Sequence, residues 1–459
     1  MISAIKFSVF IYFTNLISFS ISLKILPPKS ELGEPLFLTP YIENGEIEKA
    51  QLAAFVNPIV GDLSSYAGFI TVNKSCSSNL FFWYFPAEEF PETAPLVVWL
   101  QGGQGASSMY GLFEENGPLY FEKDGTLKTR QHYWSKVLNM IYIDNPVGTG
   151  YSFTPYDDCY ARDEERIGKE LFAFLVQFLE LFPHLEGNEL FISGESYAGK
   201  YVPAVAYTIH ENNEKNVSRI NLKGIAIGNG LSDPENMMLY SDYFYQIGLI
   251  DSNQRSVFSG LEEEIVESIR QKNFTRATYI FQELILGAFV KDGTYFHNYT
   301  GFSFIYNILH DKIYSPYGDI NKHIQSNQMR RILHVGDLEF HADLKVEKLL
   351  YDDIMKSIKP WMEVLIEKYR VLSYNGQLDL IVPYPCTLGF LHSLKWSGAD
   401  TYKNSPRRKW VVGSDLAGYW KTAKGLTEVL VRNAGHMVPA DQPVWAFDLI
   451  TRFVFNKSF

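Results

Sequence analysis

Cysteine is scarce in this chain, with three residues among 459. No two of them form a Cys-x-x-Cys pair, which argues against a zinc or dithiol redox site, and we expect neither a metal nor a cofactor. Cys76, Cys159 and Cys386 allow at most one disulfide within the chain, and their spacing leaves the pairing open. At least one cysteine must therefore stay a free thiol or bond to another chain.

Basic residues are also fewer than acidic residues. Lysine and arginine number 41 against 52 aspartates and glutamates, giving a net charge of −11 and a pI near 5.5. An acidic surface repels a phosphate backbone, so nucleic acid is not an expected partner. The composition is compatible with a homodimer but does not indicate one.

Long apolar runs are absent beyond the N-terminus, so we expect no stable membrane anchor. At the N-terminus, Lys6 precedes a largely apolar stretch over 7–21, and Ser20 and Ser22 are small residues at its end. This pattern is typical of a secretory signal peptide, here residues 1–22. We therefore expect the secretory pathway, with a lysosome-like compartment or the extracellular space as the destination.

Acceptor sequences for N-glycosylation recur after this segment. One Asn-x-Ser/Thr match can arise by chance, but several behind a signal peptide favour a glycosylated surface. The expected acceptors are Asn73, Asn216, Asn273 and Asn298.

Short apolar runs alternate with amphipathic segments along most of the chain. Runs at 95–100, 140–144 and 190–193 are typical of strands buried on both faces of a parallel sheet. Residues 163–181 repeat apolar side chains at helical spacing. The pattern predicts an α/β fold, with a mostly parallel central sheet flanked by helices. Further elements are expected as a hairpin of alternating apolar and polar residues at 68–85, strands at 222–227, 370–375, 409–412 and 426–432, and a helix at 442–455.

The alternation breaks at about residue 233. From there to about residue 343 the sequence is charged and loosely helical, with no buried strand run. We expect one domain over residues 23–459, with a helical cap insertion at about 233–343 over the site.

A serine between small residues stands at a predicted strand-to-helix corner, in Gly194-Glu-Ser-Tyr-Ala-Gly199. This is the pattern of a nucleophile elbow, in which a sharp turn lifts the Ser196 hydroxyl above the sheet edge. The N–H of Tyr197 can then point at a developing oxyanion. A serine hydroxyl also needs a base and a group that orients the base.

His436 and Asp379 are the candidates for those two roles. Each follows a predicted strand directly, at the carboxyl edge where sites of α/β sheets gather. The chain order Ser196, Asp379, His436 is that of the α/β-hydrolase fold. The second oxyanion donor is expected in the glycine-rich run 101–105, where the backbone can approach a substrate.

Several blocks of the chain together resemble the serine carboxypeptidase family, and most closely its vitellogenic carboxypeptidase-like branch. These blocks occur in the family's order, and the resemblance covers nearly the whole mature chain, with the inserted region weakest. The blocks are Trp99-Leu-Gln-Gly-Gly-Gln-Gly-Ala-Ser-Ser108, Glu115-Asn-Gly-Pro118, Asp144-Asn-Pro-Val-Gly-Thr-Gly-Tyr-Ser152, Gly194-Glu-Ser-Tyr-Ala-Gly-Lys-Tyr-Val-Pro203 and Ala434-Gly-His-Met-Val-Pro-Ala-Asp-Gln-Pro443.

The resemblance implies release of single C-terminal residues from peptides, usually at acidic pH. It implies Ser196 as nucleophile, His436 as proton shuttle and Asp379 as its orienting group, with an oxyanion hole formed by the N–H groups of Gly103 and Tyr197. The groups implied to bind the substrate are Gln101, Gly102, Glu115 and Glu195 for the free carboxylate, and Tyr110 near the residue before the scissile bond.

Two glutamates beside a substrate carboxylate are tolerable only if they carry protons, so raised, coupled pKa values and weaker peptide binding at higher pH are expected. The chain departs from the family at three positions in the first block. Gln101 replaces an asparagine, Gln104 a proline and Ala106 a cysteine that normally forms a disulfide. None of these changes removes a catalytic group.

Two other functions remain open at this point. The same acyl-enzyme can pass its acyl group to other nucleophiles, which would make the protein an acyltransferase or esterase. The fold can also serve a non-catalytic protein that stabilises a partner.

Overall fold

The structure is a computed structural model that describes residues 32–217, 219–342 and 344–459. The predicted signal peptide at residues 1–22 lies outside the described residues. Within them, no helix has the length and apolar character needed to cross a membrane.

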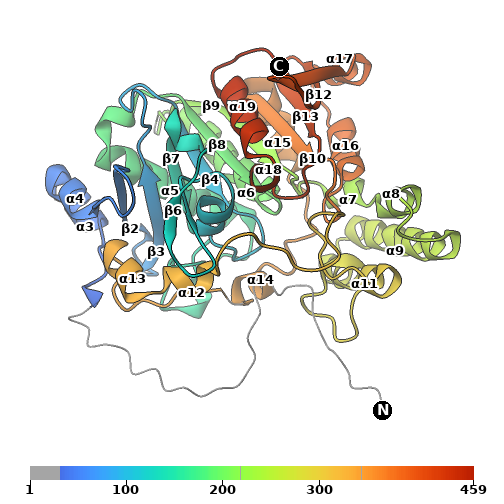
Figure 1. The fold of residues 1–459 in the computed structure, drawn as a ribbon, viewed down its shortest axis with the longest axis horizontal. Coiled ribbons are helices and arrows are strands. Elements are labelled where there is room, and N and C mark those ends of the chain that lie inside the picture. Colours follow the sequence, from blue (N-terminus) through green and yellow to red (C-terminus); the bar gives the residue numbers. More distant parts are fainter. Residues whose placement is uncertain (1–31, 218, 343) are drawn as a thin grey trace.

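A single large sheet organises the molecule (Figure 1). Its strand order is β1-β2-β3-β7-β4-β8-β9-β10-β13-β12-β11. The six strands from β7 to β13 in this order are parallel, and antiparallel strands extend the sheet on both sides. The strands of this sheet are β1 (Phe55–Val56), β2 (Ser65–Asn73), β3 (Ser78–Phe85), β4 (Leu96–Leu100), β7 (Asn139–Ile143), β8 (Leu190–Glu195), β9 (Leu222–Gly228), β10 (Arg370–Gly376), β11 (Arg408–Val412), β12 (Asp415–Ala423) and β13 (Leu426–Val431). A separate small sheet pairs β5 (Leu119–Phe121) with β6 (Leu127–Thr129).

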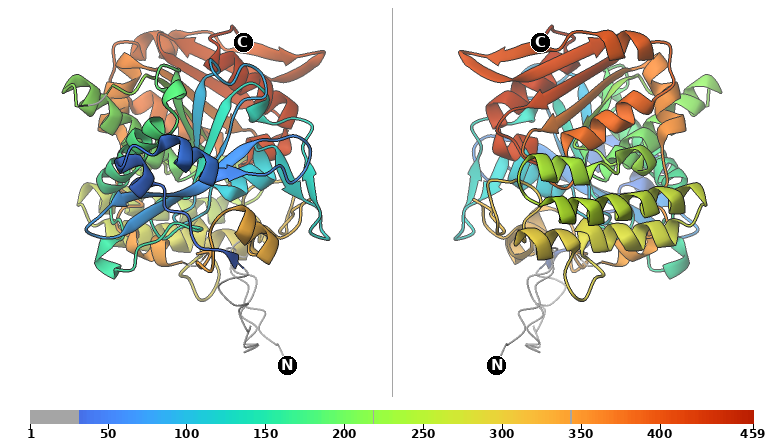
Figure 2. Two further views of the ribbon diagram at one scale, coloured as in Figure 1. Left: turned by 90° about the vertical axis from the view of Figure 1, so that its left-hand side faces the viewer. Right: turned by 90° about the vertical axis from the view of Figure 1, so that its right-hand side faces the viewer.

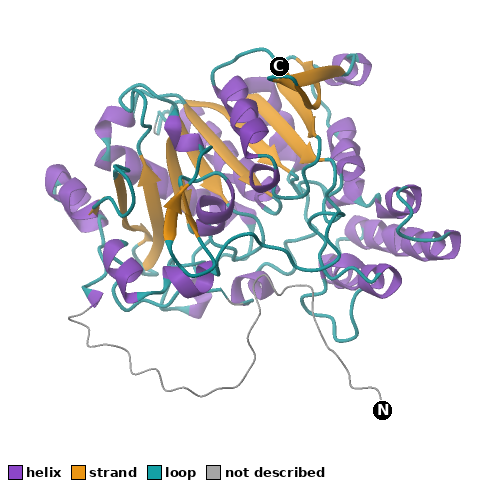
Figure 3. Ribbon diagram, in the orientation of Figure 1, coloured by secondary structure: helices purple, strands orange, loops and turns teal. Residues whose placement is uncertain are grey.

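Continuous apolar runs form the central strands because both faces of the sheet are covered. Along β4, Val98 packs into one core and its neighbours Val97 and Trp99 into another on the opposite face. Helices α5 (Glu164–Leu181), α6 (Ala198–Glu214) and α15 (Lys359–Lys368) contribute to the first core, and α19 (Pro443–Val454) to the second. Figure 3 shows the strands between these layers of helices. The predicted α/β sheet is therefore confirmed.

The remaining helices are mostly short. Many lie between β9 and β10, and Figure 2 shows those of the yellow-green part of the chain together at one side of the molecule. They are α3 (Thr39–Glu43), α4 (Ile47–Ala54), α7 (Pro234–Met237), α8 (Tyr240–Gln246), α9 (Ser252–Arg270), α10 (Phe274–Phe281), α11 (Tyr295–Thr300), α12 (Ile320–Ile324), α13 (Asn327–Ile332), α14 (Lys345–Leu349), α16 (Tyr384–Ser393), α17 (Ala399–Asn404) and α18 (Val438–Asp441). Two π-helices, η1 (Gly111–Glu115) and η5 (Gln282–Leu286), and three 3₁₀ turns, η2 (Trp134–Lys136), η3 (Asp157–Cys159) and η4 (Pro183–Leu185), complete the described elements.

The hairpin expected at 68–85 exists as β2 and β3, but its alternating pattern is wrong. All residues of β3 are buried, because this strand is an interior member of the large sheet with covered faces. Strand β12 was not expected, since its residues mix small, charged and aromatic side chains near the edge of the sheet.

The cysteine pairing that the sequence left open is resolved in the structure. Cys76 and Cys159 form a disulfide with their Cα atoms 5.7 Å apart, and Cys386 is a buried free thiol. The bond joins the β2–β3 turn to the segment that precedes α5.

Candidate active site

Ser196 stands between the end of β8 and the start of α6, as the elbow pattern predicts. Its φ of 60° lies in the left-handed region, which side chains larger than glycine seldom occupy. Two hydrogen bonds hold the turn: the Ser196 N–H donates to the Gly228 carbonyl, and the Ser196 carbonyl accepts from the Leu231 N–H, both at 2.9 Å. The end of β9 and the loop after it thus hold the strained backbone of Ser196 in place, as expected for a positioned nucleophile.

Gly102 brings the loop after β4 directly against this turn. A Cβ atom at this position would lie 2.1 Å from the Glu195 carbonyl oxygen and 2.5 Å from Cβ of Ser196. No side chain fits in that space, so the close approach of the two loops requires glycine.

Asp379 and His436 follow β10 and β13, and both are buried. Nδ1 of His436 lies 2.8 Å from Oδ2 of Asp379. The same carboxylate oxygen accepts a hydrogen bond from Asn229 Nδ2 at 2.7 Å, and Oδ1 accepts one from the Ile381 N–H at 2.9 Å. The hydrogen bonds from Asn229 and Ile381 therefore fix the Asp379 carboxylate, and this carboxylate fixes the His436 ring.

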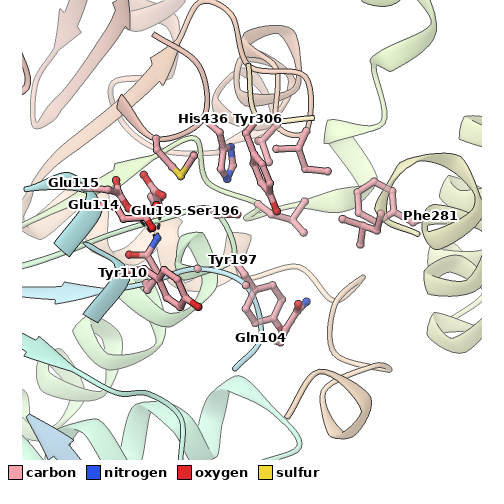
Figure 4. A pocket seen from close by; sticks show the side chains of 18 residues that line it. Gln104, Tyr110, Glu114, Glu115, Glu195, Ser196, Tyr197, Phe281, Tyr306 and His436 are labelled. Carbon is pink, nitrogen blue, oxygen red and sulfur yellow. Dashed lines mark hydrogen bonds between the residues drawn. The ribbon is translucent and has the colours of Figure 1, made fainter. Parts of the chain in front are cut away.

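The other ring nitrogen of His436, Nε2, has no hydrogen-bond partner within the described part of the chain. His436 and Ser196 line one pocket, and Figure 4 shows them on its wall. No hydrogen bond joins Ser196 to His436 in the described structure, so the two groups share a pocket without being locked together. The His436 N–H donates to the Tyr306 carbonyl at 2.7 Å, and the rings of these two residues lie 5.3 Å apart.

The expected oxyanion donors also reach the pocket. Gly103 and Tyr197 both line it, and Gly103 has a φ of 83°, which suits glycine. Helix α6 begins directly after Tyr197, so the Tyr197 N–H is among the amides that a helix start leaves without an intrahelical acceptor.

A buried cluster of one amide and two carboxyl groups forms part of the pocket wall. Nε2 of Gln101 lies 3.0 Å from Oε1 of both Glu115 and Glu195, and Oε1 of Gln101 accepts from Trp99 Nε1 at 2.9 Å. Burial raises the pKa of Glu115 to about 7. Burial, and then the neighbouring Glu115 carboxyl, raise the pKa of Glu195 well above its ordinary value. Both side chains therefore favour the protonated form at acidic pH.

The pocket has an acidic end and an apolar end, with Ser196 and His436 between them (Figure 4). Tyr110, predicted near the residue before the scissile bond, lines it as well. Phe281 lies at the apolar end, and the aliphatic side chains of Leu231, Leu286, Ile381 and Val382 also line the pocket. The acidic end is formed by Glu114, Glu115 and Glu195.

Three residues of the site were not predicted. Asn229 reaches Asp379 because β9 and β10 are neighbours in the sheet although far apart in sequence. Tyr306 lies in the region expected to be a helical insertion, where no motif marks it. Glu114 adjoins Glu115, and only its place in the π-helix η1 directs it to the pocket.

The predicted glycosylation sites lie at or near the surface. Asn216, Asn273 and Asn298 are exposed and Asn73 is half-buried. Within the described residues, no group of three or more His, Cys, Asp or Glu side chains could hold a metal ion.

Comparison with known proteins identifies the family. The serine carboxypeptidase family matches residues 57–456. The chain is 51% identical to the venom serine carboxypeptidase of Apis mellifera, covering 94% of this chain and 93% of that protein. It is 46% identical to the vitellogenic carboxypeptidase of Aedes aegypti, covering 93% and 91%. Among solved structures, it resembles Kex1Δp, a prohormone-processing carboxypeptidase from Saccharomyces cerevisiae, with a TM-score of 0.74 and 24% sequence identity. The match covers 86% of this chain and 92% of that structure, and it shows a shared fold. The family match over most of the chain and the identity to these relatives show that the chain belongs to the serine carboxypeptidase family.

Proposed function

We propose that this protein is a serine carboxypeptidase that releases the C-terminal residue of peptides through an acyl-enzyme formed on Ser196. The observation that carries the proposal is one pocket in which Ser196 and His436, the latter bonded to Asp379, lie beside the buried Gln101 cluster. A nucleophile and a group of carboxylate-binding side chains in one pocket support the removal of a single C-terminal residue.

The Asp379 contact favours the tautomer in which Nδ1 of His436 carries the proton and Nε2 presents its lone pair to the pocket. Nε2 then accepts the Ser196 hydroxyl proton as the oxygen attacks the scissile carbonyl. The N–H groups of Gly103 and Tyr197 receive the oxyanion. The protonated ring passes the proton to the leaving amine, and water hydrolyses the ester by the same steps in reverse.

The substrate carboxylate is proposed to bind Gln101, the Gly102 backbone, Glu115 and Glu195. The two glutamates can donate hydrogen bonds to it only while they are protonated, and their burial favours that form. With the carboxylate at the acidic end, the residue before the scissile bond extends toward Phe281 at the apolar end, while Tyr110 lines the pocket on the side of the glutamates (Figure 4). We therefore expect an apolar residue at that position of the substrate.

The segment over 233–343 is proposed as the cap of this site, within a domain over 23–459. Its support is that Phe281, Leu286 and Tyr306 from this segment line the active pocket. Folding in the secretory pathway is proposed from the leader sequence, the Cys76–Cys159 bond and the exposed acceptor asparagines. The destination is proposed to be a lysosome-like compartment or the extracellular space.

The test compares an N-blocked dipeptide that ends in a free acid with the same dipeptide as its C-terminal amide. We expect faster turnover of the free acid at acidic pH and loss of turnover in Ser196→Ala. Preference for simple esters over the free acid would instead favour an esterase or acyltransferase. No turnover of either, with a stably folded protein, would favour a non-catalytic role.

A further inference from the structure

A second pocket adjoins the active pocket on its acidic side. The two share Glu114, Tyr306 and Met437 as walls. Beyond them the second pocket is lined mainly by aromatic rings and a second carboxyl group. Its principal walls are Glu114, Tyr306, Tyr314, Tyr317, Met437 and Asp441.

The position of this pocket relates it to the C-terminal residue of a substrate, an argument that rests on the proposed function. The carboxylate of that residue lies at Gln101, Glu115 and Glu195, and its amide nitrogen lies at Ser196. The side chain must leave the active pocket between these two points. The second pocket adjoins this region, because it shares with the active pocket Glu114, the chain neighbour of Glu115, and Tyr306, whose ring lies 5.3 Å from the ring of His436.

The lining has the chemistry of a cation site. Tyrosine rings attract cations to their faces, and carboxylates pair with them. Among the described residues that line this pocket, His310 is the one that can carry positive charge, and its ring stacks on Tyr314 with centroids 4.4 Å apart. Arg130 lies nearby but outside the lining, where it contacts the Tyr317 ring and hydroxyl and the Phe113 carbonyl.

Glu114 has no partner of its own. It is 8% exposed, and no hydrogen bond or ion pair reaches its carboxyl group within the described residues. Burial, followed by the charge of Glu115, raises its pKa to about 8, with Asp319 acting in the same direction and Arg130 opposing it. Asp441, by contrast, accepts hydrogen bonds from the Gly435 N–H at 2.6 Å and from Asn307 Nδ2 at 2.9 Å.

A buried carboxyl without a partner is costly to ionise, and a cation beside it lowers that cost. A cationic side chain that enters the pocket would therefore bind as Glu114 releases its proton. An uncharged side chain of equal length would gain contacts with the rings but not the ion pair.

We propose that the second pocket receives the side chain of the C-terminal substrate residue and selects lysine or arginine there, with Glu114 as the determining carboxyl group. Glu114 would then set specificity, while Ser196, His436 and Asp379 perform the reaction.

The test uses N-blocked dipeptides with one apolar first residue and a free C-terminal lysine, arginine or norleucine. Norleucine matches the length of lysine without its charge. We expect kcat/KM in the wild-type protein to favour lysine over norleucine by about tenfold or more, and Glu114→Gln to remove most of that ratio while norleucine turnover persists. Glu114→Asp, which keeps the charge, should retain more of the ratio than Glu114→Gln. The exposed Glu263→Gln on α9 is the matched control and should leave the ratio unchanged.

A wild-type preference for norleucine, or a ratio that Glu114→Gln does not change, would overturn this inference. In either case continued hydrolysis of the norleucine peptide would leave the proposed function intact. Absence of turnover with every free-acid peptide would instead reject the proposed function and this inference with it.

Discussion

Nδ1 of His436 lies 2.8 Å from Oδ2 of Asp379, while Nε2 of the same ring, which belongs to a residue lining the active pocket, has no partner in the described structure. The ring is thus fixed at one nitrogen and available at the other. This asymmetry is what a general base requires, because the fixed nitrogen sets the tautomer and the available one accepts the proton.

Asn229 should influence the rate through Asp379. Its Nδ2 atom donates to Oδ2 of Asp379 at 2.7 Å, and its Oδ1 accepts from the Gly376 N–H at 3.2 Å. We expect Asn229→Ala to lower kcat about tenfold, equivalent to about 1.4 kcal/mol, and to leave KM nearly unchanged. The exposed Asn404→Ala on α17 controls for loss of an amide elsewhere. Wild-type kcat in a folded Asn229→Ala protein would contradict this role.

Binding of free-acid substrates should weaken as pH rises. Burial places the pKa of Glu115 at about 7 and that of Glu195 well above its ordinary value, so both are protonated in acid and can donate to a carboxylate. As pH rises through about 7, Glu115 loses its proton and repels the substrate. KM for a free-acid peptide should therefore increase across this range.

An ester with the same acyl group and no free carboxylate serves as the control for this titration, and its KM should stay nearly constant over the same range. In Glu115→Gln the KM for the free acid should also lose most of its pH dependence. An equal rise of KM for both substrates would assign the titration to another group.

Gly102→Ala should disable the site. The added Cβ would lie 2.1 Å from the Glu195 carbonyl oxygen, so the loop after β4 must move away from Ser196 and carry the Gly103 donor with it. We expect kcat to fall by about 10²-fold or more, the usual effect of losing one oxyanion donor. Gly187→Ala, where an added Cβ meets nothing within 4 Å, is the matched control. A fully active Gly102→Ala protein would show that the two loops need not touch.

The Cys76–Cys159 bond should contribute to stability through the unfolded chain. It closes a loop with a sequence separation of 83, for which loop-closure entropy gives about 4.5 kcal/mol. Cys76→Ser/Cys159→Ser should therefore lower the free energy of unfolding measured in denaturant. Reductant should destabilise the wild-type protein and leave the double variant unaffected. Equal sensitivity of both proteins would contradict this assignment.

The sequence predicted those parts of the site that follow central strands. Ser196, Asp379 and His436 could be placed because each comes directly after an apolar run, and the carboxyl ends of parallel strands share one edge of the sheet. The groups around Gln101 came from resemblance to the family. Their hydrogen bonds and their burial became visible only in the folded chain.

Asn229, Tyr306 and Glu114 escaped prediction for a common physical reason. Each owes its position to structure that the local sequence does not reveal. For Asn229 it is the β9–β10 pairing, for Tyr306 the hydrogen bond from the His436 N–H, and for Glu114 the π-helix η1. Strand β12 escaped because a half-exposed strand near a sheet edge needs no continuous apolar run.

Strands β9 and β10 are hydrogen-bonded neighbours, with Arg370 opposite Gly224 and Tyr374 opposite Gly228. The long stretch of chain between them thus leaves and rejoins the sheet at adjacent positions. Such an excursion can gain, lose or exchange helices without shifting the strand ends that carry Ser196, Asp379 and His436. The part of the pocket wall that this excursion supplies, with Phe281, Leu286 and Tyr306, can therefore vary while the strand ends keep their places in the sheet.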